Sequence, residues 1–251
     1  MPWIYWPRGA RDSLRDKRII APSAELFLQL DDKVQTKNLF NRLGVQTPRW
    51  GFSLKGENVL EKPIRDSGGG LAIHFTKEKT ARQGFFLEEY LPGCISLGLQ
   101  FFIHDQTEFI CADQMLYSQG ETPEFAFRGQ RNIPWEALPV SLLEDCFRVV
   151  EFLRKLGYQG LVGLDVLVGE KGHFILEINP RGIAFLPAFF AALTRGWTSF
   201  MTCQIEGEAD PQDLVLLEFG RFKKVVKRLD PEDRDSPGPA SPTGLHTGIR
   251  A

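Results

Sequence analysis

The sequence predicts an α+β fold built from antiparallel sheets. Successive strand-like segments are separated only by short turns, most clearly residues 95–103 and 109–117 around the turn 104–106. A strong helical pattern over residues 141–156 stands among them, with apolar residues recurring three and four positions apart. Parallel strands would need a long crossover connection between each pair. We therefore expect antiparallel sheets covered by a few helices rather than a doubly wound parallel sheet.

The composition excludes several classes of protein. With 251 residues, 43% hydrophobic and 25% charged, the chain has the make-up of a globular protein with a substantial core. A formal net charge of -2 gives no basic footprint, so we expect no nucleic-acid partner. No apolar run is long enough to cross a bilayer, and the start MPWIYWPRGARDSLRDKR lacks the apolar stretch of a secretory signal. Four scattered cysteines without a CxxC pair fit a reducing compartment, so we expect a cytoplasmic protein with no membrane partner.

The first half of the chain carries one helical and several strand-like patterns. Residues 24–43 have a helical apolar pattern that Gly44 and Pro48 end. Strands are expected at residues 58–64, 71–75 and 84–90. Pro63 restricts the first of these strands to a sheet edge or a strand end.

The second half adds a loop, a short helix and a tail to the elements already named. Residues 120–132 are expected to form a polar loop, and residues 185–193 a short helix. From Asp230 the composition shifts to proline, glycine, serine and charge, which predicts a disordered tail over residues 230–251.

Residues 160–181 (GLVGLDVLVGEKGHFILEINPR) predict two strands joined by a tight turn. A three-residue loop at 170–172 would use Gly172 for its left-handed position and set Gly169 opposite His173. That register sets Asp165 opposite Glu177. Side chains alternate across a strand, so the even positions share one wholly apolar face. These positions are Val162, Leu164, Val166, Val168, Phe174, Leu176 and Ile178.

The other face of this hairpin gathers oxygen-bearing side chains. Asp165, Glu177 and Asn179 share it, and like charges opposite each other repel, so we expect a cation between them. Mg²⁺ accepts few protein oxygens and completes its shell with water and phosphate. The alternative, which the hairpin alone leaves open, is the solvated face of an edge hairpin.

Three further segments carry chemistry that is weak when each is taken alone. Lys62 ends a strand and precedes RDSGGG, whose glycines let backbone N–H groups converge on an anion, although such glycines also mark flexible turns. Lys33 follows two aspartates and by itself has the pattern of a surface lysine. EEYLPG, from Glu88, places two acids where a strand breaks, which is also typical of a solvated turn.

Taken in order, these segments resemble the ATP-grasp superfamily of carboxylate–amine and carboxylate–thiol ligases. The resemblance covers residues 21–206 and rests on APSAELFLQLDDK, LFNRLGVQTP, EKPIRDSGGG, EEYLPG and GLVGLDVLVGEKGHFILEINPR. The last motif is the most specific, because Asp165 is followed after one hairpin by Glu-x-Asn-x-Arg. The resemblance implies an ATP-grasp fold, with two antiparallel-sheet lobes and ATP between them.

The resemblance also implies roles for individual residues. Two lysines, Lys33 and Lys62, would hold the ATP phosphates. The loop that closes over these phosphates would contain Ser67, Gly68 and Gly69. Adenine would lie between the lobes, beside Glu88, Glu89, Leu91 and Leu167. The Mg²⁺ ligands, which Mn²⁺ can also use, would be Asp165, Glu177 and Asn179, and Arg181 would join Lys62 at the transferring phosphoryl group.

Three departures from the family pattern qualify these expectations. Ile95 stands where many relatives have an acid for the ribose hydroxyls, and residues 182–185 (GIAF) replace small hydroxyl residues, which implies a more apolar pocket. Relatives also have a substrate-binding domain before the first lysine, and here this N-terminal domain is expected to be largely absent. We expect its remnant at residues 1–22, the small lobe at 23–92 and the large lobe at 93–229. Either the start is truncated, or a partner subunit or a second copy completes the pocket.

The expected function is an ATP- and Mg²⁺-dependent ligase. It would convert a small carboxylate, with an amino acid as first candidate, into an acyl phosphate and join it to an amine. Arg128 and Arg131 would clamp a substrate carboxylate from the polar loop, or are simply solvated. The sub-group that the pattern resembles includes tyramine–glutamate ligases of cofactor biosynthesis. Two alternatives stay open: a nucleotide-binding regulatory subunit without turnover, and ATP-dependent carboxylation or phosphorylation of a carboxylate.

Overall fold

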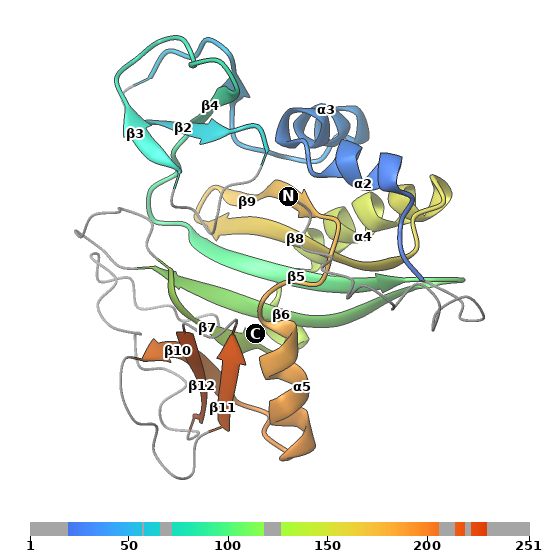
Figure 1. Cartoon of the computed structure of the whole chain (residues 1–251). Coiled ribbons are helices and arrows are strands. Elements are labelled where there is room, and N and C mark those ends of the chain that lie inside the picture. Colours follow the sequence, from blue (N-terminus) through green and yellow to red (C-terminus); the bar gives the residue numbers. More distant parts are fainter. Residues whose placement is uncertain are drawn as a thin grey trace, which may run out of the picture.

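Two antiparallel sheets form the frame of the molecule. Figure 1 shows the computed structural model, which describes residues 20–56, 58–65, 72–117, 127–205, 214–218 and 222–229. The small sheet contains, in spatial order, β1 (Trp50–Gly51), β4 (Phe85–Glu89), β2 (Val59–Pro63) and β3 (His74–Thr76). The large sheet contains β11 (Leu214–Glu218), β12 (Phe222–Arg228), β10 (Phe200–Ile205), β7 (Phe127–Ile133), β6 (Thr107–Tyr117), β5 (Ile95–Ile103), β8 (Gly160–Gly169) and β9 (Gly172–Asn179). Each neighbouring pair among these strands is antiparallel, so the predicted class is confirmed.

The helices are α2 (Ala24–Leu30), α3 (Lys33–Leu43), α4 (Val140–Lys155) and α5 (Leu186–Thr194), with a short 3₁₀ turn η2 (Trp135–Ala137). None of these described helices is long and apolar enough to cross a membrane. Three predicted segments lie outside the described residues: the first 19 residues of the remnant, the loop residues Ser67, Gly68 and Gly69, and the tail 230–251.

The single helix predicted over residues 24–43 is wrong, because the chain breaks into α2 and α3. Asp32 causes the break by capping the second helix, with its carboxylate accepting a hydrogen bond from the Gln35 backbone N–H at 3.1 Å. Lys33 therefore occupies the first position of α3. The predicted C-cap is confirmed, since Gly44 ends α3 with φ at 66°.

The polar loop predicted at residues 120–132 is also wrong in its second part. Residues 127–133 form β7, which pairs with β6 on one side and β10 on the other. The sequence FRGQRNI has no strong apolar alternation, so backbone pairing on both sides, rather than the side-chain pattern, makes this segment a strand. Arg128 and Arg131 therefore lie on a strand inside the large sheet.

The β8–β9 hairpin has the predicted pair of carboxylates but a different turn. Gly169 pairs with Gly172, so the loop has two residues, and His173 lies opposite Val168 instead of Gly169. A bulge between Asp165 and Val166 then absorbs one residue of β9, which brings Asp165 opposite Glu177 as predicted. The predicted apolar face is wrong in β9, where Ile175 is buried and both Phe174 and Leu176 are half-buried.

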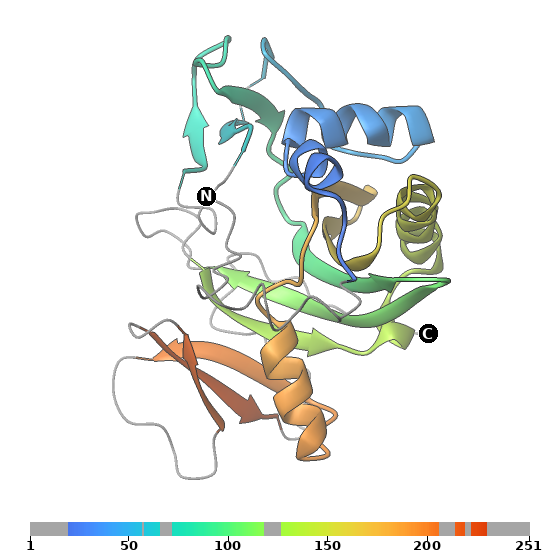
Figure 2. The ribbon, with the colours of Figure 1, turned by 45° about the vertical axis from the view of Figure 1, so that its right-hand side comes forward.

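One continuous core covers one face of the large sheet. Helices α2, α3 and α4 pack there against β5, β8 and β9, with Phe40, Leu142, Val166 and Ile175 among the buried members. Helix α5 lies on the other side of the sheet, as Figures 1 and 2 show, over a second cluster that contains Ile183, Phe185 and Phe200. The face that carries Asp165 is the one opposite α4, and α3 lies at its β9 edge.

Candidate functional site

Two elements bring lysines to the edge of the large sheet. Lys33 and Lys37 stand one turn apart on the same side of α3, while Lys62 is in β2 of the small sheet. The Lys33 backbone N–H donates to the Ile64 carbonyl at 3.0 Å, which fixes the start of α3 to the end of β2. Helix α3 and strand β2 therefore present their ammonium groups to the same region.

Glu88 of β4 joins two of these lysines. Its carboxylate accepts from Lys62 Nζ at 2.5 Å and pairs with Lys37 Nζ, which also donates to Thr47 Oγ1 at 2.6 Å. The Glu88 side chain is only 2% exposed. Burial acts to raise the pKa of Glu88, but Lys37 and Lys62 outweigh it and hold this pKa below its usual value. Glu88 is thus an ionised carboxylate between two cations.

The two lysines respond differently to the same burial. Burial lowers the pKa of Lys37 to about 8, with Glu88 opposing part of the shift. Burial also acts on Lys62, but the carboxylates of Glu88 and Glu177 outweigh it and raise the pKa of Lys62. At neutral pH both side chains therefore carry a positive charge.

The predicted carboxylate pair forms the other half of the site. Burial and the neighbouring Glu177 raise the pKa of Asp165 well above its usual value, against a hydrogen bond from Asn179 that lowers it. Burial also acts to raise the pKa of Glu177, but Lys33 and Lys62 outweigh it and the net shift is downward. Lys33 Nζ lies 3.5 Å from Glu177 Oε2, and the Glu177 side chain is 20% exposed. We call Lys33, Lys37, Lys62, Glu88, Asp165 and Glu177 the lysine–carboxylate cluster.

Other predicted site residues lie around this cluster without a described contact to it. The Glu89 side chain forms a bidentate pair with Arg49 at 2.8 and 3.0 Å, and its backbone N–H donates to the Arg49 carbonyl. Leu91 and Leu167 are half-buried, and Leu167 pairs with Ser96 and Phe174. Arg181 is exposed just beyond β9, with its guanidinium 3.4 Å from the Gly182 carbonyl oxygen.

The two predicted substrate arginines do not converge on the cluster. Directly paired residues of antiparallel strands share a face, and Arg131 pairs with Gln114, which pairs with the buried core residue Leu97. Arg131 therefore belongs to the face that α4 covers, opposite the face of Asp165. Arg128 is exposed and sits at an irregularity in the β6–β7 register.

The sequence interpretation missed Lys37 and a narrow notch beside the carboxylates. Gly98 and Gly163 lie in neighbouring strands, and Ile183 fills the space above them. Its backbone N–H donates to Gln100 Oε1 at 2.7 Å. This contact anchors the segment that follows Arg181 to the sheet.

Replacing Gly163 with alanine is expected to lower the free energy of unfolding by about 1–3 kcal/mol, because the added methyl group overpacks this notch. A Cβ at Gly163 would lie 2.4 Å from Ile183 Cγ2. Urea denaturation measures the change, and Gly182→Ala is a matched control whose nearest contacts would be 3.4 and 3.5 Å. Adding Ile183→Ala should restore part of the loss, and an unchanged Gly163→Ala stability would contradict the packing described here.

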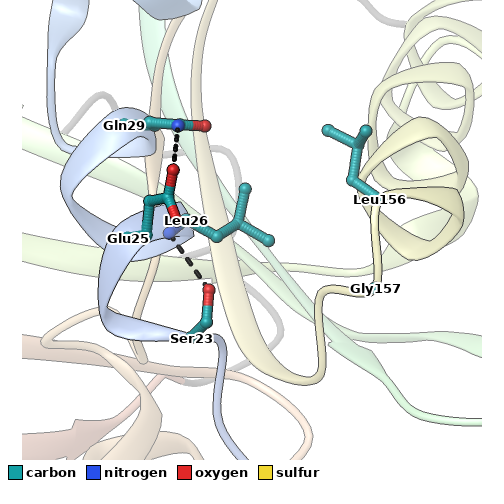
Figure 3. A pocket seen from close by; sticks show the side chains of 6 residues that line it. All are labelled: Ser23, Glu25, Leu26, Gln29, Leu156 and Gly157. Carbon is teal, nitrogen blue, oxygen red and sulfur yellow. Dashed lines mark hydrogen bonds between the residues drawn. The ribbon is translucent and has the colours of Figure 1, made fainter.

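Two hollows of the described surface contain no residue of the cluster, although one of them reaches Thr47, which accepts a hydrogen bond from Lys37. One, of about 380 Å³, is lined by Ser23, Glu25, Leu26, Gln29, Leu156 and Gly157, between the start of α2 and the end of α4 (Figure 3). In that view Ser23 caps α2 and Glu25 accepts a hydrogen bond from Gln29, so these polar groups already serve the helix. A second, of about 410 Å³, lies at residues 41–54 and contains Thr47 and Arg49. Neither hollow contains a residue of the lysine–carboxylate cluster.

The side chains of the cluster fit a divalent cation and phosphate groups. Two neighbouring carboxylates in a buried place repel each other, and this repulsion helps to raise the pKa of Asp165. A cation between them would remove the repulsion. No group of three or more His, Cys, Asp or Glu side chains in the described part of the chain is arranged to hold a metal ion, so the third protein oxygen would come from Asn179. The oxygen donors suit Mg²⁺, and the neighbouring lysines suit phosphate.

Comparisons with known proteins agree with this fold and these groups. A family model described as an ATP-grasp domain matches residues 30–184, more than half of the chain. The chain therefore belongs to the ATP-grasp family.

The individual relatives share only a low sequence identity with the chain. The chain is 24% identical over 194 residues to an enzyme of Niallia circulans named [butirosin acyl-carrier protein]–L-glutamate ligase. The match covers 65% of this chain and 46% of that protein, so the chain spans about half the length of this curated relative.

Solved structures confirm the ATP-grasp fold. Carboxyaminoimidazole ribonucleotide synthase of Aspergillus clavatus, complexed with ATP, superposes with a TM-score of 0.64 at 10% identity, covering 88% of this chain and 74% of that one. An L-amino acid ligase of Bacillus licheniformis gives a TM-score of 0.57 at 11% identity, covering 82% and 68%. Because the sequence identities are this low, these matches support the fold and nothing further.

Proposed function

We propose that the chain is an ATP- and Mg²⁺-dependent ligase that activates a small carboxylate, with an amino acid as first candidate, and joins it to an amine. The observation that carries the proposal is the convergence of Lys33 and Lys62 on the carboxylate pair of Asp165 and Glu177. The names of two relatives support the class of reaction, since one is a glutamate ligase and the other an amino acid ligase.

The proposed reaction has two steps. A carboxylate oxygen of the substrate attacks the γ-phosphorus of ATP, and the bond from that phosphorus to the bridging oxygen breaks, which gives an acyl phosphate and ADP. The amine nitrogen then attacks the acyl carbon, the C–N bond forms and the C–O bond to phosphate breaks. The proton released by the amine goes to phosphate or solvent water.

The residues of the chain contribute charge and position to this chemistry. Lys33 and Lys62 would bind the phosphate oxygens, and Arg181 would stabilise the charge on the transferring group. Asp165, Glu177 and Asn179 would hold Mg²⁺, which when bound neutralises phosphate charge. No side chain needs to form a covalent bond with the substrate, because phosphoryl transfer depends mainly on alignment and electrostatic stabilisation.

Other predicted residues would complete the nucleotide and substrate site. Adenine would lie beside Leu91, Leu167 and the backbone of Glu89, and the loop containing Ser67, Gly68 and Gly69 would close over the phosphates. Residues 23–92 would act as the small lobe and 93–229 as the large lobe. A partner subunit or a second copy would complete the pocket for the carboxylate and the amine.

The test is ADP formation by the purified chain with Mg²⁺-ATP and paired panels of amino acids and amines. We expect ADP only with a productive pair, together with a product whose mass equals both substrates minus water. ATP binding without stimulated ADP formation under any pairing would favour the alternative of a regulatory subunit. A carboxylated product, or a phosphorylated carboxylate that persists when amines are present, would favour the other alternative.

A further inference from the structure

Lys37 is a buried cation that the proposed reaction leaves without a role. Its side chain is 1% exposed, and it stands one turn after Lys33 on α3. Lysine is almost never buried this deeply without a partner, because removing an ammonium group from water is costly. A residue so enclosed has no surface left with which to touch a substrate.

The ion pair of the Lys37 ammonium connects it to Lys62, one of the two lysines proposed to bind phosphate. Lys37 Nζ donates a hydrogen bond to Thr47 Oγ1 at 2.6 Å and forms an ion pair with one carboxylate oxygen of Glu88. The other oxygen of Glu88 accepts from Lys62 Nζ at 2.5 Å. Lys37 and Lys62 therefore hold opposite sides of the same carboxylate.

Charge balance argues against a purely structural pair. One carboxylate is neutralised by one ammonium group, and Lys62 alone would satisfy Glu88. The second ammonium leaves this buried group of three with a net positive charge, which the nearby Glu177 carboxylate offsets in part and an arriving polyanion would offset further. The remaining excess favours a phosphate-bound protein over the free one.

We infer that Lys37 is a positioning residue, which holds the Glu88 carboxylate so that Glu88 in turn holds the ammonium group of Lys62 toward the nucleotide phosphates. The inference rests on the proposed nucleotide site. Lys37 supplies orientation and a second positive charge from behind, while Lys33 and Lys62 touch the phosphates. Four charged or polar groups from the neighbouring elements face Lys37, namely Thr47, Lys62 of β2, Glu88 of β4 and Glu177 of β9.

The experiment is calorimetric titration of the whole chain with Mg²⁺-ATP between pH 7 and pH 9, in buffers of different ionisation enthalpy. Because the pKa of Lys37 is about 8, part of the population is neutral near this pH, and an arriving anion raises the pKa. Binding by the parent protein is therefore expected to take up a fraction of a proton near pH 8, and to weaken as the pH rises further.

In Lys37→Met this proton uptake should disappear and the dissociation constant should rise about ten-fold or more, as loss of one nearby charge implies. Thr47→Val is a milder variant that keeps the charge but removes a hydrogen bond to it, so the uptake should move to lower pH. Lys171→Met, at the exposed hairpin turn, should behave as the parent.

The outcomes separate this inference from the function on which it rests. A parent protein that binds no Mg²⁺-ATP overturns both. A parent that binds, with Lys37→Met equal to it in affinity and proton uptake, overturns the role of Lys37 alone. If Lys37→Met does not fold, Thr47→Val decides, since an unmoved uptake profile would contradict the inference and a shifted one would support it.

Discussion

Glu177→Gln is expected to lower Mg²⁺-dependent ADP formation by about 10²–10³-fold, the range for removing one preorganised electrostatic group from an active site. Glutamine keeps the size of the side chain and one acceptor oxygen, so the change removes mainly the charge. Glu177 lies opposite Asp165 and 3.5 Å from Lys33, and it is one of the proposed ligands of the cation. Initial rates of ADP formation at saturating Mg²⁺ and ATP measure the effect.

Stability distinguishes a catalytic role from a structural one at this position. Lys33 and Lys62 hold the pKa of Glu177 below its usual value, so removing this charge costs some stability, and the relief of repulsion from Asp165 offsets only part of that cost. A moderate loss in the free energy of unfolding is therefore expected at Glu177→Gln, with a folded protein whose rate falls strongly. Glu170→Gln, at the exposed turn of the same hairpin, is the matched control. A Glu177→Gln protein that turns over at the rate of the parent would show that the hairpin face is only a solvated surface.

The hairpin shows how much of the site the sequence can predict. The register expected from a three-residue turn correctly places Asp165 opposite Glu177, although the turn has two residues, because the bulge after Asp165 shifts the pairing by one residue. The turn was predicted wrongly, since both a two-residue and a three-residue loop use Gly172. The bulge that reconciles the two registers is a response to packing, which buries Ile175 in place of its neighbours. Sequence alternation alone gives no sign of it.

Residues that meet across the fold were harder to predict. The spacing of Lys33 and Lys37 places both on one side of a helix, and this was a usable signal. What the spacing does not reveal is that Glu88, about 50 residues later, faces Lys37 from β4 of the small sheet. Arg131 illustrates the reverse error. Its polar neighbours indicate a loop, whereas pairing with β6 and β10 assigns it to the far face of the large sheet.

The largest loss of stability is expected from Glu88→Gln, which removes the carboxylate that both buried ammonium groups, those of Lys37 and Lys62, contact directly. Breaking a buried ion pair in this way costs about 3–5 kcal/mol in the free energy of unfolding. Urea denaturation at pH 7 measures it. Glu89→Gln, on the next residue of β4, removes a charge that is paired with the exposed Arg49, so only a small change is expected there.

The pH dependence of this loss follows from the sign of the Lys37 shift. Burial already lowers the pKa of Lys37 to about 8, and without Glu88 it should fall further. A lysine whose pKa is depressed in the folded state destabilises the protein while it is protonated, and this cost fades as the pH rises through the folded-state pKa. Glu88→Gln should therefore regain stability relative to the parent as the pH rises toward 8, and the difference should level off above pH 8, where Lys37 of the parent also loses its proton.

A double variant tests whether stranded charge, rather than lost packing, causes the effect. Adding Lys37→Met to Glu88→Gln removes one of the two ammonium groups, so the pair of changes should cost less than the sum of the single ones. If the costs simply add, or if Glu88→Gln is as stable as the parent at pH 7, the two lysines do not depend on Glu88. In the expected case, the Glu88 carboxylate, which is also predicted to lie beside adenine, holds the buried charges of α3 and β2 together, and Lys62 keeps its position through it.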